Sequence, residues 1–407
     1  MAIIEKGEIT VMKREMTILI AVAIVSAALA GCGSQGNEKS EEAVSAETAD
    51  HVQSAKTPST TTEAPEIEQL PETTTDNEKA ILGEVTTAVK DAPKKFDANN
   101  ISERNFTFWD RMGEDHIMGQ TELAFYYAMN ELSQGKITAD MMISGEIDVD
   151  STNLPEVYSV CDVARYQLEL AAQNGYAKGS VFGLPYLFES REHFWNFAES
   201  DLGQQVIDEI NDGGFACHVL TYIEEGARSY FSTKEHPINT ADDLAGLKIR
   251  VQSSDIYNGM VQAVGASPTT MAWSEVYTGL SSGVIDAAEN PYTGYNANML
   301  YEVAPNFYED EHIWGADILT ISSEIWNSMN DDEKEMVQEA AAIASEYNKK
   351  HIEQVESDIK SKIEREGVTI VTPSADDKAK LVDLCKPMNK KFAGDYLDFI
   401  DQIKALK

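Results

Sequence analysis

The chain has 407 residues, a length typical of two or three domains, and 43% of them are hydrophobic, as in an ordinary globular core. Its formal net charge is -37 at pH 7. Such a charge repels DNA, RNA and anionic lipid, and therefore argues against a nucleic-acid partner. It does not exclude a small anionic ligand, because a local basic pocket outweighs distant, screened charges.

The N-terminus has the pattern of a secretory signal. Lys13 and Arg14 precede an apolar run that is too short and too rich in alanine for a good membrane span. The run ends in LAGC, residues 29–32, which resembles the bacterial lipobox, whose cysteine becomes a lipidated mature N-terminus. We predict a signal peptide over residues 1–31, lipidation of Cys32 and an extracytoplasmic protein held at the membrane surface. The alternative is an ordinary signal peptide with an incidental cysteine.

Residues 32–100 are predicted to form a disordered tether. The segment is rich in Thr, Glu, Ser and Pro and poor in aromatic residues. Such a composition cannot bury enough apolar surface to offset the conformational entropy of the chain. Residues 79–90 have the composition of a short helix, on which nothing further is built.

The first part of the folded chain alternates between strand and helix patterns. Phe106 and Phe108 alternate with polar residues, which indicates a strand, and the amphipathic pattern of residues 119–135 indicates a helix that ends at glycine. Further strands are predicted at 137–144, 157–166 and 214–222, and a buried apolar turn leads into a helix over 181–200.

The second part repeats the alternation. Strands or extended segments are predicted at 247–251, 266–272, 284–291 and 368–374, with helices over 255–265 and 273–283 and two short helices at the end of the chain. Strands that alternate with helices favour an α/β architecture with parallel sheets.

One long helix pattern runs from Ser328 to Gly367. It starts at an Asn/Asp cap and ends at glycine, as helix boundaries do. At 1.5 Å per residue it would be about 60 Å long, longer than a small domain. A helix of this length is expected to bridge two lobes.

The sequence contains no motif for catalysis, a nucleotide or a metal. GxGxxG, GxxxxGK[ST] and GxSxG patterns are absent, and the seven histidines are scattered. Cys161, Cys217 and Cys385 have no metal-binding spacing, and their odd number leaves at least one thiol without a partner in the chain. Buried, inert thiols are the simpler interpretation. We predict no enzyme, no cofactor and no metal.

Arg250 is the residue that most clearly suggests a ligand. It lies near the C-terminal end of the KIRV strand, where open α/β sheets bind ligands. Its guanidinium group matches a carboxylate with two parallel hydrogen bonds. A structural salt bridge with a protein acid is an equally good interpretation from residue type alone. Trp273 can line a pocket or pack in the core, and Asn290 can contact a ligand or cap a turn.

A long block around Arg250 resembles a known family. The letters DDLAGLKIRV, then VGASPTTMAWSEVYTGLSSGVIDAAENP, are similar to the signature of the solute-binding proteins of tripartite ATP-independent periplasmic (TRAP) transporters, of the C4-dicarboxylate- and sialic-acid-binding type. Ala287 stands where glycine is usual. The resemblance extends from about residue 106 to 407. It implies a two-lobe Venus-flytrap fold with a ligand cleft and a long helix that spans both lobes.

The resemblance also implies roles for particular residues. Arg250 would pair with a ligand carboxylate, Arg228 in GARSYF would be a second cationic contact, and Asn290 a polar contact. Trp273 replaces the usual Phe that packs on the ligand. A weaker match of CDVARYQL implies further cleft contacts, and the first loop adds two more; these residues are Arg165, Asp162, Asp115 and His116.

The chain departs from the family pattern before residue 157. A helix is usual there, but this chain has only STNLPEV, in which Pro155 disfavours a helix interior. A lost or shortened helix is therefore expected in the first lobe. The predicted division of the chain is a first lobe over 101–225, a second lobe over 226–315, and a return to the first lobe, long helix and C-terminal helices over 316–407.

The predicted function is capture of an organic acid in the interlobe cleft and its delivery to TRAP membrane subunits. One alternative is a binding protein that senses a ligand for a membrane receptor. A less favoured one is an extracytoplasmic enzyme, for which no nucleophile and base are apparent. The identity of the acid is not evident from the sequence.

Overall fold

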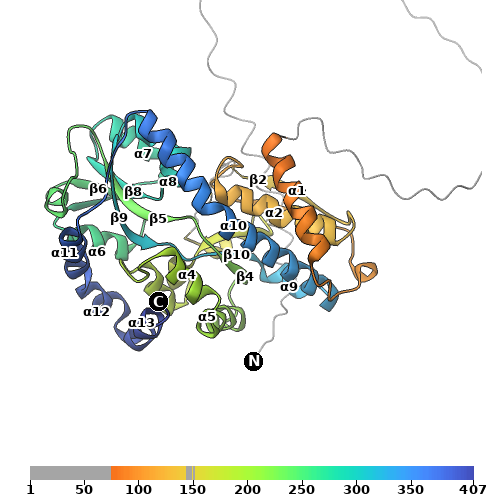
Figure 1. Ribbon diagram of the computed structural model, residues 1–407. Helices are drawn as coiled ribbons and strands as arrows, with labels where there is room; N and C mark the ends of the chain where they lie inside the picture. Colours follow the sequence, from red (N-terminus) through yellow and green to blue (C-terminus); the bar gives the residue numbers. More distant parts are fainter. Residues whose placement is uncertain (1–74, 144–148, 150–151) are drawn as a thin grey trace, which may run out of the picture. The chain divides into compact units, whose positions relative to one another are not determined.

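The computed structural model describes residues 75–143, 149 and 152–407 (Figure 1). The predicted signal peptide, the lipidation site Cys32 and most of the predicted tether lie outside these residues. Within the described part of the chain, no helix combines the length and the apolar character that a membrane span requires.

The first lobe is built on a five-stranded sheet with the order β2-β1-β3-β10-β4. Its strands are β1 (Arg104–Trp109), β2 (Ile137–Met142), β3 (Val163–Gln167), β4 (Cys217–Ile223) and β10 (Asp317–Ser322). Its helices are α1 (Asp76–Asp91), α2 (Ile117–Leu132), α3 (Leu154–Val157), α4 (Arg191–Ala198), α5 (Asp201–Asp212) and α9 (Ser323–Ser328).

The second lobe is built on a six-stranded sheet with the order β11-β9-β5-β8-β6-β7. Its strands are β5 (Ala227–Ser232), β6 (Lys248–Val251), β7 (Ser267–Thr270), β8 (Ala287–Asn290), β9 (Asn306–Trp314) and β11 (Thr369–Val371). Its helices are α6 (Asp255–Ala263), α7 (Val276–Ser281) and α8 (Tyr292–Ala297).

The prediction of parallel sheets holds for only part of each sheet, because both sheets are mixed. β10 runs antiparallel to β3 and β4, and β5 runs antiparallel to β8 and β9. β4 leads directly into β5, and β9 leads directly into β10, with no helix in between. A strand that enters from the other lobe without a crossover helix need not keep the parallel direction that a βαβ unit imposes.

The long helix is confirmed as α10 (Asp331–Arg365), which has 35 residues and is about 52 Å long. It begins at a capping box in which Asn330 accepts a hydrogen bond from the Glu333 amide (3.0 Å) and the Glu333 carboxylate accepts one from the Asn330 amide (2.9 Å). Figure 1 shows it passing from α2 in the first lobe to α8 in the second. The two-lobe α/β architecture follows the prediction.

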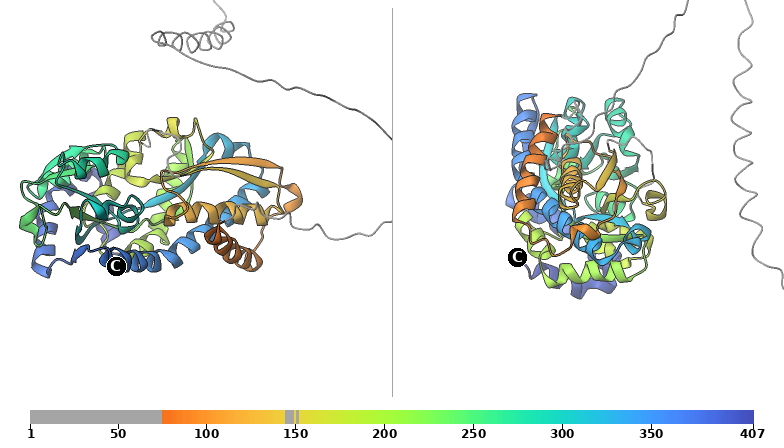
Figure 2. Two further views of the ribbon diagram at one scale, coloured as in Figure 1. Left: turned by 90° about the horizontal axis from the view of Figure 1, so that it is seen from above. Right: turned by 90° about the vertical axis from the view of Figure 1, so that its right-hand side faces the viewer.

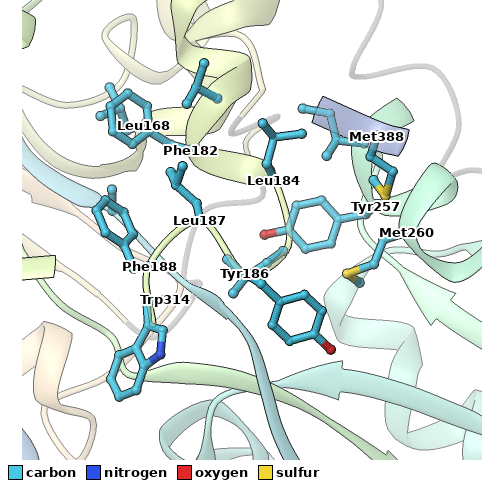
Figure 3. Close-up of a cluster of buried hydrophobic side chains, with 14 of the residues drawn as sticks. Leu168, Phe182, Leu184, Tyr186, Leu187, Phe188, Tyr257, Met260, Trp314 and Met388 are labelled. Atoms are coloured by element: carbon cyan, nitrogen blue, oxygen red, sulfur yellow. The ribbon is translucent and has the colours of Figure 1, made fainter. Parts of the chain in front are cut away.

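Three helices end the chain, rather than the two expected. They are α11 (Ala375–Cys385), α12 (Pro387–Ala393) and α13 (Leu397–Lys404), and the first two pack beside α6. Figure 3 shows the apolar cluster that they help to form. In it Leu168 and Phe182, which follow β3, share one cluster with Tyr257 of α6 and Met388 of α12. This cluster contains residues of both lobes and so links them.

All three cysteines of the described chain are buried and free, as predicted. Burial raises the pKa of Cys161, Cys217 and Cys385 to about 12 in each case. A thiol of this kind is almost fully protonated at neutral pH and is a poor nucleophile.

The departure before residue 157 is visible as a very short helix. α3 has four residues, and Pro155 lies in its first turn, where the missing amide proton costs nothing. Leu154 and Val157 are buried, so the short segment still covers the core.

The tether prediction is wrong for residues 76–91, which form α1. Thr75 and Glu78 make a capping box at its start, and Ile81, Val85 and Val89 form a buried stripe with a spacing of four residues. Figure 2 shows α1 (orange) beside α2 and α10. This helix includes residues 79–90, whose composition suggested a short helix within the predicted tether.

We predict that α1 contributes to the stability of the folded protein. Ile81→Ala should lower the free energy of unfolding by about 2–5 kcal/mol, because Ile81 is only 1% exposed and its removal leaves a cavity. Urea denaturation measures this change. Thr87→Ala, on the exposed face of the same helix, is the control and should stay within about 0.5 kcal/mol of wild type. Equal effects of the two substitutions would contradict the packing of α1.

Candidate functional site

A narrow cleft of about 40 Å³ lies between the two sheets. Several of its residues stand at or just after the C-terminal ends of strands β1, β3, β4, β6, β7 and β8, where open α/β sheets bind ligands. The lining residues are Arg111, Met112, Arg165, Gln167, Glu225, Arg228, Arg250, Gln252, Trp273 and Asn290.

Arg250 is a buried cation in this cleft, with 3% of its surface exposed. Its Nε and Nη2 atoms donate to the Met271 carbonyl oxygen at 3.0 and 2.7 Å, and its guanidinium carbon lies 5.3 Å from the Trp273 ring centroid. No carboxylate in residues 75–143, 149 and 152–407 forms an ion pair with it. Burial lowers the pKa of Arg250 to about 10; Arg228 and Arg111 add to this decrease, and Glu289 opposes it.

Arg250 therefore remains charged at neutral pH, and in the described part of the chain Glu289 acts on it without forming an ion pair. The sequence left a structural salt bridge and an external anion as equal alternatives for this residue. The described part of the chain supplies no acid for the first alternative. A buried cation that is compensated only by a carbonyl dipole and an aromatic face is suited to accept an anion.

Arg228, in contrast, already has a protein partner. Its Nε and Nη2 atoms donate to the two carboxylate oxygens of Glu289 at 2.6 and 2.9 Å. The pairing of β5 with β8 brings the two residues together. Burial alone would raise the pKa of Glu289, but Arg228 and then His312 lower it to about 2. Arg228 lines the cleft, while most of its charge is committed to Glu289.

Arg165 is also held by protein acids. It donates to Asp110 at 2.8 Å, and its Nη1 atom lies 3.6 Å from Glu225 and 3.5 Å from Asp317. Burial raises the pKa of Asp317 well above its usual range although Arg165 opposes this shift. Arg165 faces the cleft from the first lobe as part of this acidic cluster.

Three predicted contacts do not line the cleft. The Asp162 carboxylate accepts from the Thr107 amide at 2.9 Å and so fixes β3 to β1, and Asp115 is exposed. His116 caps α2 by accepting from Met118, and its Nε2 atom lies 3.6 Å from Glu225, a cleft residue. Asp162, Asp115 and His116 are therefore not among the lining residues of the cleft, and their contacts with a ligand stay a prediction.

Asn290 and Trp273 do line the cleft, as the sequence predicted. The Asn290 side chain is 5% exposed, and its Oδ1 atom has no hydrogen-bond partner within the described part of the chain. A Cβ atom at Gly294 would lie 1.9 Å from this Oδ1. Gly294 in α8 therefore makes room for the Asn290 amide.

Five cleft residues were not predicted from the sequence: Arg111, Met112, Gln167, Glu225 and Gln252. Gln167 is the last residue of β3, and the other four stand one to three residues after a strand. This position is the only signal that could have found them, and correct strand ends are needed to read it.

The comparisons with known proteins define the class. Residues 102–395 match the family described as bacterial extracellular solute-binding protein, family 7. A solute-binding protein of Chromohalobacter salexigens is 31% identical over 217 residues, which cover 53% of this chain and 63% of that protein, less than two thirds of its length. A sialic acid-binding periplasmic protein of Vibrio cholerae is 27% identical over 65% of this chain and 80% of that protein.

Solved structures show the same fold. A TRAP periplasmic solute binding protein of Xanthobacter autotrophicus with bound β-D-galacturonate superposes with a TM-score of 0.69 at 27% identity, over 74% of this chain and 100% of that chain. A TRAP protein of Chromohalobacter salexigens with bound D-glucuronate gives 0.69 at 25% identity, with the same coverage. The chain belongs to the family 7 extracellular solute-binding proteins, the binding components of TRAP transporters. The class is thus a binding protein and not an enzyme.

We predict that the Arg228–Glu289 pair makes folding stability depend on acid. The pKa of Glu289 falls from an ordinary 4.5 to about 2 in the folded protein. A depressed carboxyl pKa contributes stability that is complete above the unfolded value and is lost as pH falls toward the folded value, here between about 4.5 and 2. The shift corresponds to about 3 kcal/mol.

Urea denaturation at pH 7, 5, 4 and 3 tests this dependence. The free energy of unfolding of wild type should fall more steeply below pH 4.5 than that of Glu289→Gln, which cannot titrate. Glu335→Gln, an exposed carboxylate on α10, should follow wild type. If the free energy of unfolding depends on pH in the same way in wild type and Glu289→Gln, the Arg228–Glu289 pair is not the cause of the acid dependence.

Proposed function

We propose that this protein captures an organic acid in the cleft and that Arg250 binds its carboxylate. The observation that supports this role is the buried guanidinium without an acid partner in the described chain. A ligand carboxylate would neutralise that charge and receive directed hydrogen bonds from it. Trp273, which flanks the same guanidinium, would pack on the ligand body.

The polar lining favours a ligand that carries hydroxyl groups as well as a carboxylate. Gln167, Gln252 and Asn290 offer amide donors and acceptors, and Glu225 offers an acceptor. Related proteins from Xanthobacter and Chromohalobacter were solved with galacturonate and glucuronate. Sugar acids are therefore the ligand class that we propose, with uronates as its first members.

We also propose that the bound acid is delivered to TRAP membrane subunits by a protein anchored through lipid on Cys32. The family match supports the membrane partner, and the LAGC letters support the anchor. Both the closing of the cleft around the acid and its release would involve the two lobes, since lining residues come from each of them.

We predict that Arg250→Ala weakens binding of the acid by about 2–5 kcal/mol, as expected for loss of one partner of a buried charge pair. A thermal-shift screen of uronates, aldonates and dicarboxylates identifies the ligand first, because a ligand at 100 times its Kd adds roughly 2.7 kcal/mol of stability. Calorimetry then compares wild type with the variant.

Lys248→Ala is the matched control for this experiment. Lys248 is on the same strand and pairs with Asp286 outside the cleft, so its removal should leave affinity nearly unchanged. A loss of less than threefold in Arg250→Ala would exclude Arg250 as the carboxylate site. No thermal shift with any acid in the panel would count against the ligand class itself.

We predict that Cys32→Ser releases the protein from membranes when the full chain is produced in a bacterial host. Without the thiol no lipid can be attached, and the acidic protein itself has little affinity for anionic lipid. Fractionation of wild type and variant measures this, with mass spectrometry of the mature N-terminus. Membrane retention of the serine variant would argue against the anchor.

A further inference from the structure

Three segments of the described chain pass between the lobes, and one side chain touches all of them. The segments are the β4–β5 connection, the β9–β10 connection and the middle of α10. Arg191, the first residue of α4 in the first lobe, contacts Glu224 in the first segment, Trp314 at the second and Glu356 in the third. None of these four residues lines the ligand cleft.

The contacts of Arg191 are specific. Its Nε atom donates to the two Glu224 oxygens at 2.8 and 3.1 Å, and its Nη2 atom donates to Glu356 Oε2 at 2.5 Å. Its guanidinium carbon lies 5.3 Å from the Trp314 ring centroid. The planar guanidinium can make these contacts at the same time, whereas an ammonium group could not.

Glu224 is itself fixed from both sides. It is fully buried and also accepts from Trp195 Nε1 of α4 at 2.9 Å. Its backbone amide donates to Asn348 Oδ1 of α10 at 2.8 Å, and its carbonyl accepts from Asn348 Nδ2 at 3.1 Å. The β4–β5 connection is therefore tied to the spanning helix as well as to α4.

Glu356 lies directly over Gly226 in the β4–β5 connection. Gly226 has a φ of +108°, and a Cβ atom there would lie 2.2 Å from Glu356 Oε1. A hollow of about 180 Å³, lined in part by Ala227, Trp314 and Glu356, borders the same connection. Because apolar packing is incomplete on this side, the conformation of the β4–β5 connection depends more on its polar contacts with Arg191, the partner of Glu356, and with Asn348.

The lobes touch across the cleft in this arrangement. Trp273 of the second lobe packs against apolar clusters of both lobes. Contacts that fix the connections between the lobes therefore favour an arrangement in which the cleft residues lie close together.

We infer that Arg191 and Glu356 form a hinge clamp that stabilises this arrangement of the lobes and so sets ligand affinity without touching the ligand. This inference rests on the proposed function for its binding readout. Burial raises the pKa of Glu356 to about 7, with Arg191 acting in the opposite direction and Glu224 and Glu311 adding to the increase. Arg191 thus favours the charged form of Glu356, with which it forms an ion pair.

The experiment compares Glu356→Ala and the milder Glu356→Gln and Arg191→Lys with wild type. Glu353→Ala is the matched control, because Glu353 borders the same hollow on the same helix and is exposed. Dissociation rate and affinity are measured by stopped flow and calorimetry with the acid identified in the screen. We expect Glu356→Ala to bind three- to thirtyfold more weakly through faster dissociation, the two milder variants to lie between, and the control to equal wild type.

A second readout needs no ligand. Spin labels on Asp140→Cys and Ser282→Cys, exposed positions in the two lobes, report the interlobe distance in a Cys32→Ser background. Loss of the clamp should shift this distance distribution, while Glu353→Ala leaves it in place. If the distribution and the dissociation rate of Glu356→Ala both match wild type, the clamp is overturned.

The two proposals fail in different ways. If wild type binds no acid, the proposed function fails, and the ligand-free distance distribution alone decides on the clamp. If wild type binds an acid and Arg250→Ala does not, but Glu356→Ala shows no change in either readout, only the clamp fails. A variant that unfolds is replaced in this comparison by Glu356→Gln, which keeps a hydrogen-bonding side chain of nearly the same size.

Discussion

The uncompensated charge of Arg250 is the constraint around which the cleft is organised. A buried guanidinium is costly unless an anion or several acceptors stabilise it. Here the Met271 carbonyl and the Trp273 ring provide partial compensation, and burial lowers the pKa of Arg250 to about 10. A bound carboxylate would remove the remaining free-energy cost of the buried cation. The empty cleft is therefore less stable, and ligand binding is correspondingly more favourable.

Two other cleft arginines, Arg228 and Arg165, differ from Arg250 because protein acids pair with them. Arg228 is neutralised by Glu289, and Arg165 lies among Asp110, Glu225 and Asp317. Their fixed ion pairs give the cleft a rigid polar wall. Arginines that the family signature gives as ligand contacts can therefore be paired with a protein acid or lack such a pair within one site. Only their neighbours in the fold distinguish the two cases.

At the hinge, buried acids need a compensating cation, just as the buried Arg250 in the cleft needs an anion. Glu224 and Glu356 are acids in a poorly solvated place, and Arg191 compensates both while it bridges segments that belong to different lobes. An ion-pair network located at the connections can influence the lobe arrangement more than one on the lobe surface. A ligand can shift that equilibrium only through the difference between its affinities for the lobe arrangements.

The sequence by itself determined the elements with strong local signals. The 3.6-residue periodicity and the Asn cap define α10, and the block around KIRV, with Trp273 and Asn290, identifies the family and part of the cleft. Only the tertiary structure decided the rest. The mixed sheets, the folding of α1 onto α2 and the partners of Arg250, Arg228 and Arg165 depend on contacts between residues far apart in the chain, for which local patterns carry no information. Whether a charge is neutralised depends on which groups lie within a few ångströms of it, and the fold brings those groups together.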